Sequence, residues 1–368
     1  MSATLKAGAM AGTGDLVTMK HGAGGRAMRR LIEETLAAGF VDTPVDGFGL
    51  AAMDDGAALR VGDQWLVVTT DSHVVHPIVF PGGDIGRLAI AGTVNDLAMM
   101  GATEPLGLTS AIIVEEGFRR ADLERVQRSM QDTCREAGVT IVTGDTKVMG
   151  RGELDGLVIN TTGVAMTTSL VRDAGLRPGD RIILTGTIGD HGIALMAKRH
   201  GLAFEVELTS DVAPINGLIR SALAAVPGGI TAMKDPTRGG VASALHEMAE
   251  KSGVCIVIEE PQVPVNPVVR AAAEMLGLDP FHIANEGKAL LGVRPEAAAA
   301  VLAALRAHPQ GGAAAIVGTC LADHPGRLVL DTGIGRRLMT ESEGEPLPRI
   351  CLKLSPKPAT GPTPSGCR

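Results

Sequence analysis

Aspartates recur at the ends of apolar segments throughout this chain, and one of them occupies an unusual position. Asp96 lies in the C-terminal half of an apolar stretch, Asp84–Met100, where burial and the helix dipole both disfavour a negative charge. A lone aspartate of this kind is more often exposed to solvent or bonded to backbone N–H groups. Comparable positions, however, hold Asp54, Asp55, Asp71, Asp145 and Asp235. Carboxylate oxygens are ligands that Mg²⁺ prefers, so the repetition favours a magnesium site.

A glycine-rich segment, His21–Arg26, precedes a helical pattern of apolar residues and contains Gly24 and Gly25. A loop of this kind before a helix can surround phosphate with backbone N–H groups. Glycine-rich turns before helices are also common without any ligand. The chain has no GxxxxGK[ST] loop, so a nucleotide here would be held mainly through metal.

Three polar segments interrupt apolar runs further along the chain: 144–147 (GDTK), 234–240 (KDPTRGG) and 285–288 (NEGK). The first follows a buried-type strand, and we expect a turn that presents Asp145 and Lys147 at the carboxyl end of that strand. Such ends are favoured ligand positions in α/β folds. Each segment also fits an ordinary turn, although the second is richer in charge and glycine than a connection requires.

Of the five cysteines, Cys351 alone lies in a short apolar and proline-containing segment after an acidic linker, 341–345. Cys134, Cys255 and Cys320 fall in or beside predicted helices and strands, where small core residues are expected. Cys367 lies in the proline-rich end, which we expect to be disordered. About ten extended residues span roughly 33–36 Å, so the linker would let Cys351 reach both outward and inward.

These groups must be positioned by two α/β units separated near residues 176–180 (LRPGD). In the first unit the pattern predicts strands at 65–70, 109–114, 139–143 and 157–164, and helices at 84–100 and 119–137. In the second it predicts strands at 181–185, 230–233, 254–258, 289–293, 315–319 and 327–330, and helices at 191–200, 214–225, 241–251, 267–276 and 296–307.

Composition narrows the class of protein. The chain has 368 residues, 45% of them hydrophobic, which suffices for two cores. A net charge of −7, no Tyr, one Trp and six Phe argue against a nucleic-acid partner. No apolar stretch is long enough to span a membrane, so we expect no membrane segment. An odd number of cysteines without close pairing favours reduced thiols and a cytoplasmic location.

Six motifs, in order, resemble the HypE family of carbamoyl dehydratases. They are MDDGAAL (53–59), TTDSHVVHPIVFPGGDIGRLAIAGTVNDLAMMGA (69–102), GDTKV (144–148), KDPTRGG (234–240), ANEGKAL (284–290) and LPRIC (347–351). The resemblance runs from about residue 20 to residue 351. It also places the chain in the aminoimidazole ribonucleotide synthetase-like superfamily, with selenophosphate synthetase and thiamine-monophosphate kinase.

The resemblance implies a two-domain α/β (α+β) fold. Its parts would be an N-terminal arm (1–44), an ATP-binding domain (45–170), a C-terminal α/β domain (171–340) and a flexible tail (341–368) that carries Cys351. In this superfamily the ATP-binding domain pairs with a second copy to form a β-barrel, so a homodimer is implied.

The implied activity uses ATP and Mg²⁺. The carbamoyltransferase HypF would load a carboxamide onto Cys351, and ATP-driven loss of water would leave a thiocyanate. The nitrile would then pass to iron on the HypC–HypD complex during [NiFe] hydrogenase maturation. An amide oxygen is a poor leaving group, so dehydration requires its conversion to a phosphate ester.

The resemblance also implies residue roles. Asp54 and/or Asp55, with Asp71, Asp96 and Asp235, would hold Mg²⁺ at the phosphates. The nucleotide site would further include Gly24, Gly25, Asn95, Gly144, Asp145 and Lys147. Lys147 would neutralise charge on the transferred phosphoryl group or the amide oxygen, and Glu286 would be the base. The implied catalytic residues are Cys351, Glu286, Lys147 and Asp96.

The sequence departs from the family pattern at one point, and two alternative functions remain open. In the family the cysteine is normally the last residue, whereas Leu352–Arg368 follow it here. A different synthetase or small-molecule kinase of the superfamily would not need Cys351; selenophosphate synthetase is disfavoured, because Met19-Lys20-His21 lacks the expected nucleophile. A non-catalytic, nucleotide-gated scaffold is the other alternative.

Overall fold

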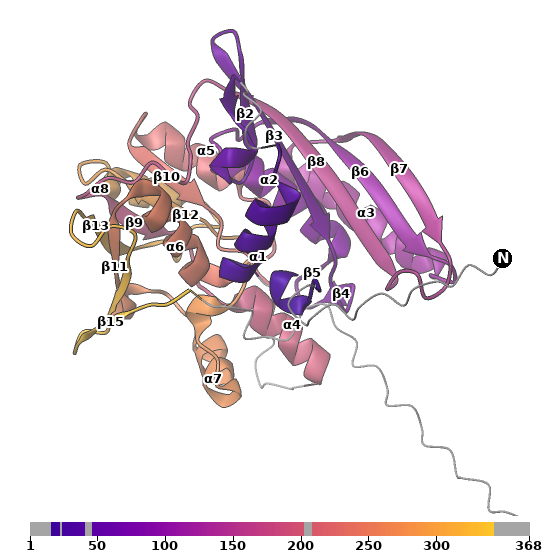
Figure 1. Ribbon diagram of the computed structural model, residues 1–368. Helices are drawn as coiled ribbons and strands as arrows, with labels where there is room; N and C mark the ends of the chain where they lie inside the picture. Colours follow the sequence, from indigo (N-terminus) through magenta and orange to yellow (C-terminus); the bar gives the residue numbers. More distant parts are fainter. Residues whose placement is uncertain (1–15, 23, 41–45, 202–207, 342–368) are drawn as a thin grey trace, which may run out of the picture.

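Two β-sheets with their helices follow one another along the chain. The computed structural model describes residues 16–22, 24–40, 46–201 and 208–341 (Figure 1). The first sheet is built from strands within residues 47–167 and the second from strands within residues 181–338.

The first sheet has six strands in the order β1-β2-β3-β8-β6-β7. They are β1 (Gly47–Phe48), β2 (Ala57–Val61), β3 (Gln64–His73), β6 (Pro105–Glu115), β7 (Ile141–Met149) and β8 (Leu157–Thr167). Every neighbouring pair is antiparallel except β6 and β7, which are parallel. A small hairpin of β4 (Val79–Phe80) and β5 (Gly83–Asp84) leads into helix α2.

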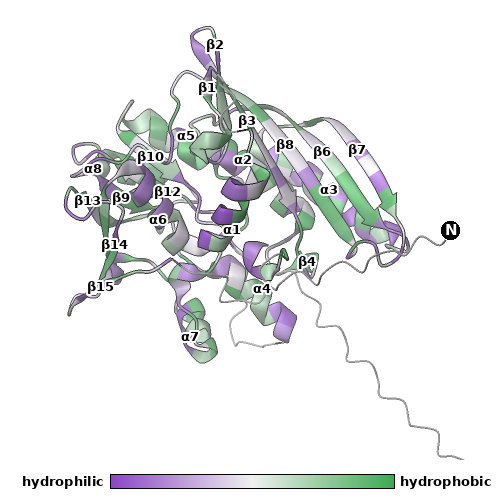
Figure 2. Cartoon of the chain, viewed as in Figure 1, coloured by the Kyte–Doolittle hydropathy of each residue, from purple (hydrophilic) through white to green (hydrophobic). Residues whose placement is uncertain are grey.

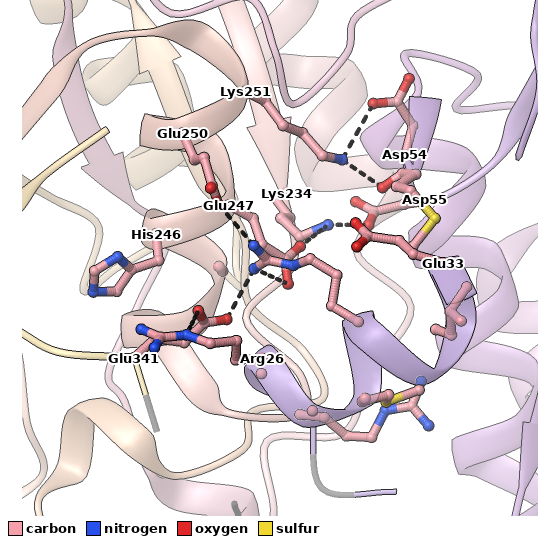
Figure 3. Close-up of a pocket in the computed structure, with 18 of the residues that line it drawn as sticks. Arg26, Glu33, Asp54, Asp55, Lys234, His246, Glu247, Glu250, Lys251 and Glu341 are labelled. Atoms are coloured by element: carbon pink, nitrogen blue, oxygen red, sulfur yellow. Dashed lines mark hydrogen bonds and ion pairs between the residues drawn. The ribbon is translucent and has the colours of Figure 1, made fainter. Parts of the chain in front are cut away.

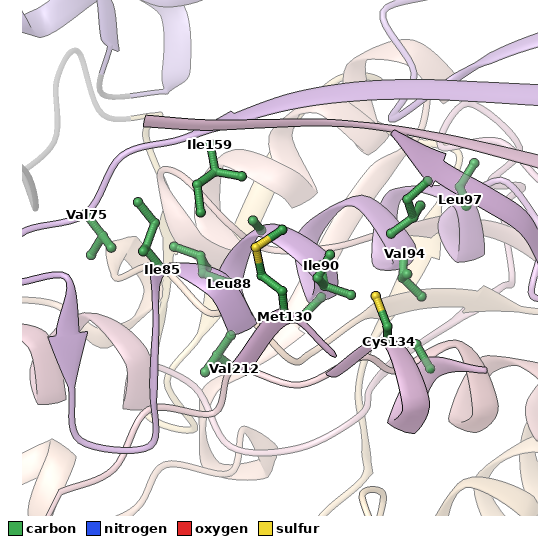
Figure 4. Close-up of a cluster of buried hydrophobic side chains, with 14 of the residues drawn as sticks. Val75, Ile85, Leu88, Ile90, Val94, Leu97, Met130, Cys134, Ile159 and Val212 are labelled. Atoms are coloured by element: carbon green, nitrogen blue, oxygen red, sulfur yellow. The ribbon is translucent and has the colours of Figure 1, made fainter. Parts of the chain in front are cut away.

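Helix α2 (Ile85–Met99) is the centre of the first half. Asp84 caps it, as predicted, by accepting a 3.0 Å hydrogen bond from the N–H of Arg87. All of its residues except Arg87 and Asp96 are buried, because α2 packs on β3, β8 and helix α3 (Arg120–Ala137). Figure 4 shows this core, with α2 side chains meeting those of the sheet and of α3.

Strand β7 forms one edge of this sheet and is exposed along almost its whole length. Val142 and Val148 are 63% and 67% exposed, which is unusual for β-branched apolar residues in a strand. Figure 2 shows that apolar and polar residues both occur along β7. This edge therefore presents apolar surface to solvent in the single chain.

The second sheet has seven strands in the order β10-β12-β9-β13-β11-β14-β15. They are β9 (Arg181–Leu184), β10 (Ile230–Lys234), β11 (Cys255–Glu259), β12 (Leu290–Val293), β13 (Ala315–Leu321), β14 (Leu328–Asp331) and β15 (Arg336–Leu338). The helices of this half are α4 (Asp190–His200), α5 (Asn216–Ala225), α6 (Gly240–Ser252), α7 (Pro267–Leu276) and α8 (Ala298–Ala307).

Both faces of the second sheet are covered. Ile182 and Leu184 of β9 pack in one core with α6, whereas Ile183 packs in another with α5 and α8. This alternation follows from the two-residue period of a strand and shows that β9 is buried on both faces.

Helix α2 also joins the two halves. Ala98 and Met99 pack in the same core as α5. The side-chain amide of Asn216 at the start of α5 donates to the backbone carbonyls of Thr103 and Ala137. The residues that precede the first sheet form η1 (Met19–Gly22), α1 (Gly25–Leu31) and a π-helical turn, η2 (Ile32–Leu36); α1 lies between the two halves (Figure 1).

Three predictions about these elements were wrong. Strand β3 continues to His73, so Asp71 lies inside the strand and does not end it. Residues 144–147 lie within strand β7 and form no turn. Both sheets are largely antiparallel, so the rule that ligands favour the carboxyl ends of strands in α/β folds does not apply here. The predicted helices are confirmed to within about two residues, the usual uncertainty of helix ends. No helix in the described part of the chain is long and apolar enough to cross a membrane.

Candidate active site

Four aspartates from separate elements line one cavity of about 520 Å³. They are Asp55 before β2, Asp71 on β3, Asp96 on α2 and Asp235 directly after β10; Glu286 lines the same cavity. The first half of the chain supplies three of the aspartates and the second half supplies Asp235 and Glu286. Four of the six aspartates that the sequence singled out are thus brought together between the two halves, whereas Asp54 and Asp145 do not line this cavity.

Thr69 connects two of these acidic segments. Its hydroxyl lies 2.8 Å from the backbone carbonyl oxygen of Asp55 and 3.0 Å from Oδ2 of Asp96. Asp96 is also one of the two residues of α2 that are not buried among apolar side chains. Its position in an otherwise apolar helix is therefore explained by its exposure to this cavity.

Burial and repulsion by neighbouring carboxylates raise the pKa of Asp96 and Asp235. Burial is the largest cause for Asp96, whose pKa is well above the ordinary value, and repulsion by Asp235, Asp71 and Asp55 adds to it. Burial, followed by repulsion from Asp55, raises the pKa of Asp235 to about 8. Clustered anionic oxygens of this kind are stabilised by a bound divalent cation.

The donor set fits Mg²⁺, because it consists of carboxylate oxygens. Among the described residues, no group of three or more His, Cys, Asp or Glu side chains is arranged to enclose a metal ion by itself. Magnesium in nucleotide sites is usually bound by one or two carboxylates together with phosphates and water. Asp55, Asp71, Asp96 and Asp235 are the residues that would hold it.

Asp54 and Asp55 are adjacent in sequence but form ion pairs and hydrogen bonds with different residues. Asp54 pairs with Arg172 (Nε–Oδ2, 2.5 Å), and its side chain has no exposed surface. Burial and a hydrogen bond with Asp173 raise the pKa of Asp54 to about 6 against the opposing effect of Arg172. Asp55 instead faces the acidic cavity while accepting a 2.6 Å hydrogen bond from Lys234. The geometry therefore favours Asp55 over Asp54 as the metal ligand.

Asn95 was expected to contact the nucleotide. Its side chain instead forms hydrogen bonds with backbone groups of the protein. Its Oδ1 accepts from the N–H of Ile215 (2.8 Å), and its Nδ2 donates to the carbonyls of Ala213 (3.1 Å) and Glu286 (3.4 Å). Both amide N–H groups and the oxygen of Asn95 are thus engaged by the backbone. Asn95 supports the site and does not line it.

A second, larger cavity of about 810 Å³, whose lining residues are drawn in Figure 3, shares residues with the first. Four residues line both cavities: Asp55, Asp235, Thr237 and Arg238. Gly24 and Gly25 line the larger one, so the glycine-rich segment lies beside the acidic residues. Gly24 has a φ of +80°, and a Cβ there would lie 3.0 Å from the backbone of Arg238. Its glycine permits close packing of the N-terminal segment on the loop after β10.

Gly144, Asp145 and Lys147 do not line either cavity. Strand β7 is separated from β3 by β8 and β6, which corresponds to about 14 Å at ordinary strand spacing. The register places Asp145 opposite Ala111 and Asp71 opposite Thr161, which is itself opposite Ser110. Asp145 and Lys147 therefore lie on the opposite face of the sheet from Asp71.

The C-terminal cysteines lie outside the described residues. The last described residue, Glu341, lines the larger cavity with its side chain only 6% exposed. Cys134, Cys255 and Cys320 are buried free thiols, which confirms the prediction that they are core residues.

Sequence reasoning missed several residues of the site. His73 lies two residues after Asp71 on the same face of β3, and its Nε2 is 3.5 Å from Oδ2 of Asp71. Arg238 lines both cavities, and Lys234 donates a hydrogen bond to Asp55. The charge and glycine content of residues 234–240 was a usable signal for these last two residues. The strand period was the available signal for His73.

Comparisons with known proteins assign the chain to a family. The N-terminal domain of the AIR synthase related proteins matches residues 53–167, and their C-terminal domain matches residues 177–331. The carbamoyl dehydratase HypE of Rhizobium leguminosarum bv. viciae is 47% identical over 338 residues, which cover 91% of this chain and 95% of that protein.

Solved structures agree with this sequence comparison. A crystal structure of a HypE–HypF complex matches with a TM-score of 0.79 and 42% identity, over 85% of this chain and 99% of that one. HypE in complex with ATP matches with a TM-score of 0.75 and 42% identity, over 90% of this chain and 99% of that one. With the acidic cavity and the six motifs in place, we conclude that the chain belongs to the HypE family of carbamoyl dehydratases, among the AIR synthase related proteins.

Proposed function

We propose that this protein dehydrates a carboxamide carried on its own Cys351, using ATP, and thereby makes the nitrile for [NiFe] hydrogenase maturation. The observation that carries the proposal is the convergence of Asp55, Asp71, Asp96 and Asp235 with Glu286 in one cavity. That cavity adjoins the one in which the described chain ends at Glu341. Relatives at 47% identity named carbamoyl dehydratase, and the HypE structure with ATP, support the same activity.

The chemistry divides into two steps. In the first, the carboxamide oxygen attacks the γ-phosphorus of ATP, an N–H proton leaves, and ADP departs, so that sulfur carries an imidate phosphate. In the second, the C–O bond breaks, the remaining N–H proton leaves, and the products are a thiocyanate and inorganic phosphate. The oxygen of the lost water thus ends on phosphate, and no oxidant or reductant is required.

The protein's own groups have distinct tasks in these steps. Glu286 is half-buried, and burial with repulsion by Asp235 and Asp211 raises its pKa well above the ordinary value of a glutamate. A carboxylate with a raised pKa is a stronger base, which suits removal of an N–H proton. When Mg²⁺ is bound, it supplies charge neutralisation at the phosphates. Phosphoryl transfer depends mainly on such positioning and neutralisation.

The position of Cys351 after the last described residue limits how far its thiol can reach. Cys351 lies ten positions after Glu341, a reach of at most about 33–36 Å. Glu341 lines the larger cavity and Glu286 lines the adjoining acidic cavity. The carbamoylated Cys351 would approach Glu286 through these two cavities. The proposed reaction needs Cys351 as a free thiol, which suits a reducing compartment such as the cytoplasm.

Lys147 would act from a second copy of the chain. Because β7 is an exposed edge and Lys147 lies on the face opposite Asp71, one chain does not bring this lysine to its own acidic cavity. Pairing of two first sheets in a homodimer would cover Val142 and Val148 and provide the lysine to the partner's site. HypF would load Cys351, and the HypC–HypD complex would receive the nitrile; the HypE–HypF complex structure supports the first partner.

The proposal is tested by loading the thiol without any partner. Cyanate adds to a thiol as isocyanic acid and leaves a carboxamide on sulfur. After loading and removal of cyanate, the intact mass of the peptide that contains Cys351 is followed with and without ATP. We expect ATP to remove one water in wild type, and Cys351→Ser to show neither loading at that peptide nor water loss. A loaded wild-type peptide whose mass is unchanged by ATP would refute the proposal.

The runner-up function is a small-molecule kinase of the same superfamily. Such an enzyme would leave ATP consumption on a diffusible substrate intact in Cys351→Ala. Full ATP turnover by this variant would therefore favour the kinase. A protein that binds ATP but never changes the mass at Cys351 would instead be a nucleotide-gated scaffold.

A further inference from the structure

The backbone of Glu286 is held from both sides by residues that the proposed reaction does not otherwise use. Its N–H donates to Oδ1 of Asp211 (3.1 Å). Its carbonyl accepts from Nδ2 of Asn95 (3.4 Å) and from the N–H of Ala213 (3.4 Å). Both backbone groups of this one residue are thus fixed by the segment around residues 211–213 and by helix α2.

Asp211 is itself held rigidly against the same loop. Its side chain is 4% exposed, and its Oδ2 pairs with Nζ of Lys288 at 3.0 Å. Lys288 is two residues after Glu286, so the carboxylate of Asp211 spans the loop from the Glu286 N–H to the Lys288 ammonium. Gly287 lies between them, and a Cβ there would be 2.0 Å from the carbonyl oxygen of Asp211. The contact therefore requires glycine at this position.

The segment that carries Asp211 is anchored to three other elements. The N–H of Ser210 donates to the carbonyl of Pro81 (2.9 Å), and its hydroxyl lies 2.7 Å from Nδ1 of His191. The N–H of Ile215 donates to Asn95 (2.8 Å). A support with so many fixed points can hold Glu286 in a single position.

We propose that Asp211 is the positioning residue for Glu286 in the dehydration step, acting through its hydrogen bond from the Glu286 N–H. The inference rests on the proposed function, in which Glu286 removes a proton from the carboxamide. A general base must lie within hydrogen-bond reach of the proton that it removes, and a displacement of about 1 Å can cost 100-fold in rate. A support of this kind affects the chemical step without touching the nucleotide.

Two substitutions separate the hydrogen bond from the charge. Asp211→Asn keeps Oδ1 as an acceptor for the Glu286 N–H and loses the charge that pairs with Lys288. Asp211→Ala loses both. The matched control is Asp180→Ala, because Asp180 is also buried and accepts from a backbone N–H (Arg177, 2.9 Å) and a hydroxyl (Thr231, 2.7 Å), but it does not line either cavity.

The experiment uses the full chain, loaded at Cys351 with cyanate and mixed with saturating ATP. The rate of water loss in a single turnover, the ATP concentration that gives half of that rate, and the melting temperature are measured for each variant. We expect Asp211→Ala to slow water loss about 10- to 100-fold with an unchanged half-saturating ATP concentration, as for supporting residues of other active sites. Asp211→Asn should stay within about threefold of wild type, since the acceptor remains. Asp180→Ala should lose melting temperature and keep the wild-type rate.

Three results would overturn the inference: Asp211→Ala dehydrating at the wild-type rate, Asp180→Ala slowing the step as much as Asp211→Ala, or Asp211→Asn being as slow as Asp211→Ala. If Asp211→Ala does not fold, Asp211→Leu tests the same claim, because it keeps the branched shape of the side chain and removes the oxygen that accepts from the Glu286 N–H. It should slow water loss at unchanged half-saturating ATP, and a wild-type rate would refute the inference. A loaded wild-type chain that keeps its water identifies failure of the proposed function itself.

Discussion

Arg29 of helix α1 donates a 2.8 Å hydrogen bond from Nη2 to Oε1 of Glu341, the last described residue before the tail that carries Cys351. Their side chains are 22% and 6% exposed, so the pair is largely sheltered from solvent. Arg29 also contacts Glu247 and Glu250 of helix α6, and Figure 3 shows Glu247, Glu250 and Glu341 around the same cavity. The start of the tail is thereby fixed beside the acidic site.

Loss of this anchor should slow the reaction of the loaded tail. Glu341→Gln removes the carboxylate that meets Arg29, and a freer tail has a lower effective concentration of Cys351 at the site. We expect water loss about three- to tenfold slower, measured by mass on the cyanate-loaded chain. Glu250→Gln is the control, because it removes another partner of Arg29 and leaves the tail anchor intact. Equal rates for wild type and Glu341→Gln would show that the anchor is irrelevant to catalysis.

Asp96→Asn and Asp54→Ala should change the stability of the protein in opposite directions. Asp96→Asn removes a carboxylate repelled by three others, so the metal-free protein should be more stable in urea by about 1 kcal/mol while dehydration is lost. Asp54→Ala leaves the guanidinium of Arg172 without its buried hydrogen-bond partner and should destabilise the protein by about 1–3 kcal/mol. Denaturant unfolding in EDTA measures both changes. A destabilised Asp96→Asn would contradict the repulsion on which the metal site rests.

His191 should make the protein less stable in acid. Burial lowers the pKa of His191 to about 4, below its ordinary value of 6.5. Between these values the unfolded chain binds a proton that the folded protein does not, so the free energy of unfolding falls as the pH falls. The loss from pH 6.5 to pH 4 is about 3 kcal/mol and is absent above pH 6.5. Urea unfolding at pH 7 and pH 4.5 should show a smaller difference for His191→Gln than for wild type, whereas His200→Gln, at an exposed position, should match wild type. Identical pH dependence in wild type and His191→Gln would contradict this assignment.

Lys147 can be tested by mixing two inactive variants. Lys147→Ala and Asp96→Asn should each fail to dehydrate the loaded cysteine. In a mixed dimer, one of the two sites has an intact acidic cluster from one chain and an intact Lys147 from the other. Equal mixing with subunit exchange should therefore restore about one quarter of wild-type activity. If the mixture stays inactive while exchange is verified by mass, Lys147 does not act between chains.

The residues after Cys351 should be dispensable. We expect truncation after Cys351 to preserve or raise the rate of water loss, because a free carboxyl terminus can enter the cavity without a following chain. The same mass measurement, compared between the two lengths, tests this expectation. A truncated chain that loads but no longer loses water would show that residues 352–368 have a role.

The sequence predicted those parts of the site that depend on local patterns. The sequence of α2 shows an apolar helical pattern that begins after a capping residue, Asp84. It also contains one charged residue that needs an explanation, Asp96. Asp96 lines the same cavity as Asp71 and Asp235. These predictions succeeded because burial of a charge is costly wherever the chain folds.

Other features depend on tertiary packing that local patterns do not contain. Asp54 and Asp55 are adjacent, and which of them faces the cavity is decided by Arg172 and Lys234, both far away in sequence. Asn95 and Asp96 are separated by about 100° around one helix, so only one of them faces the cavity. The sequence of the exposed edge strand β7 predicts a strand followed by a turn, because Gly and Asp, here Gly144 and Asp145, are common turn residues. In the structure both lie within β7.

The most direct test of the account follows the carboxamide oxygen. The chain is loaded at Cys351 with ¹⁸O-labelled cyanate, ATP is added, and the masses of the Cys351 peptide and of the released inorganic phosphate are measured together. We predict that the peptide loses its labelled oxygen with two hydrogens and that the label appears in the phosphate. Unlabelled phosphate, or a peptide that retains the label while ATP is consumed, would contradict dehydration through a phosphate ester at Cys351.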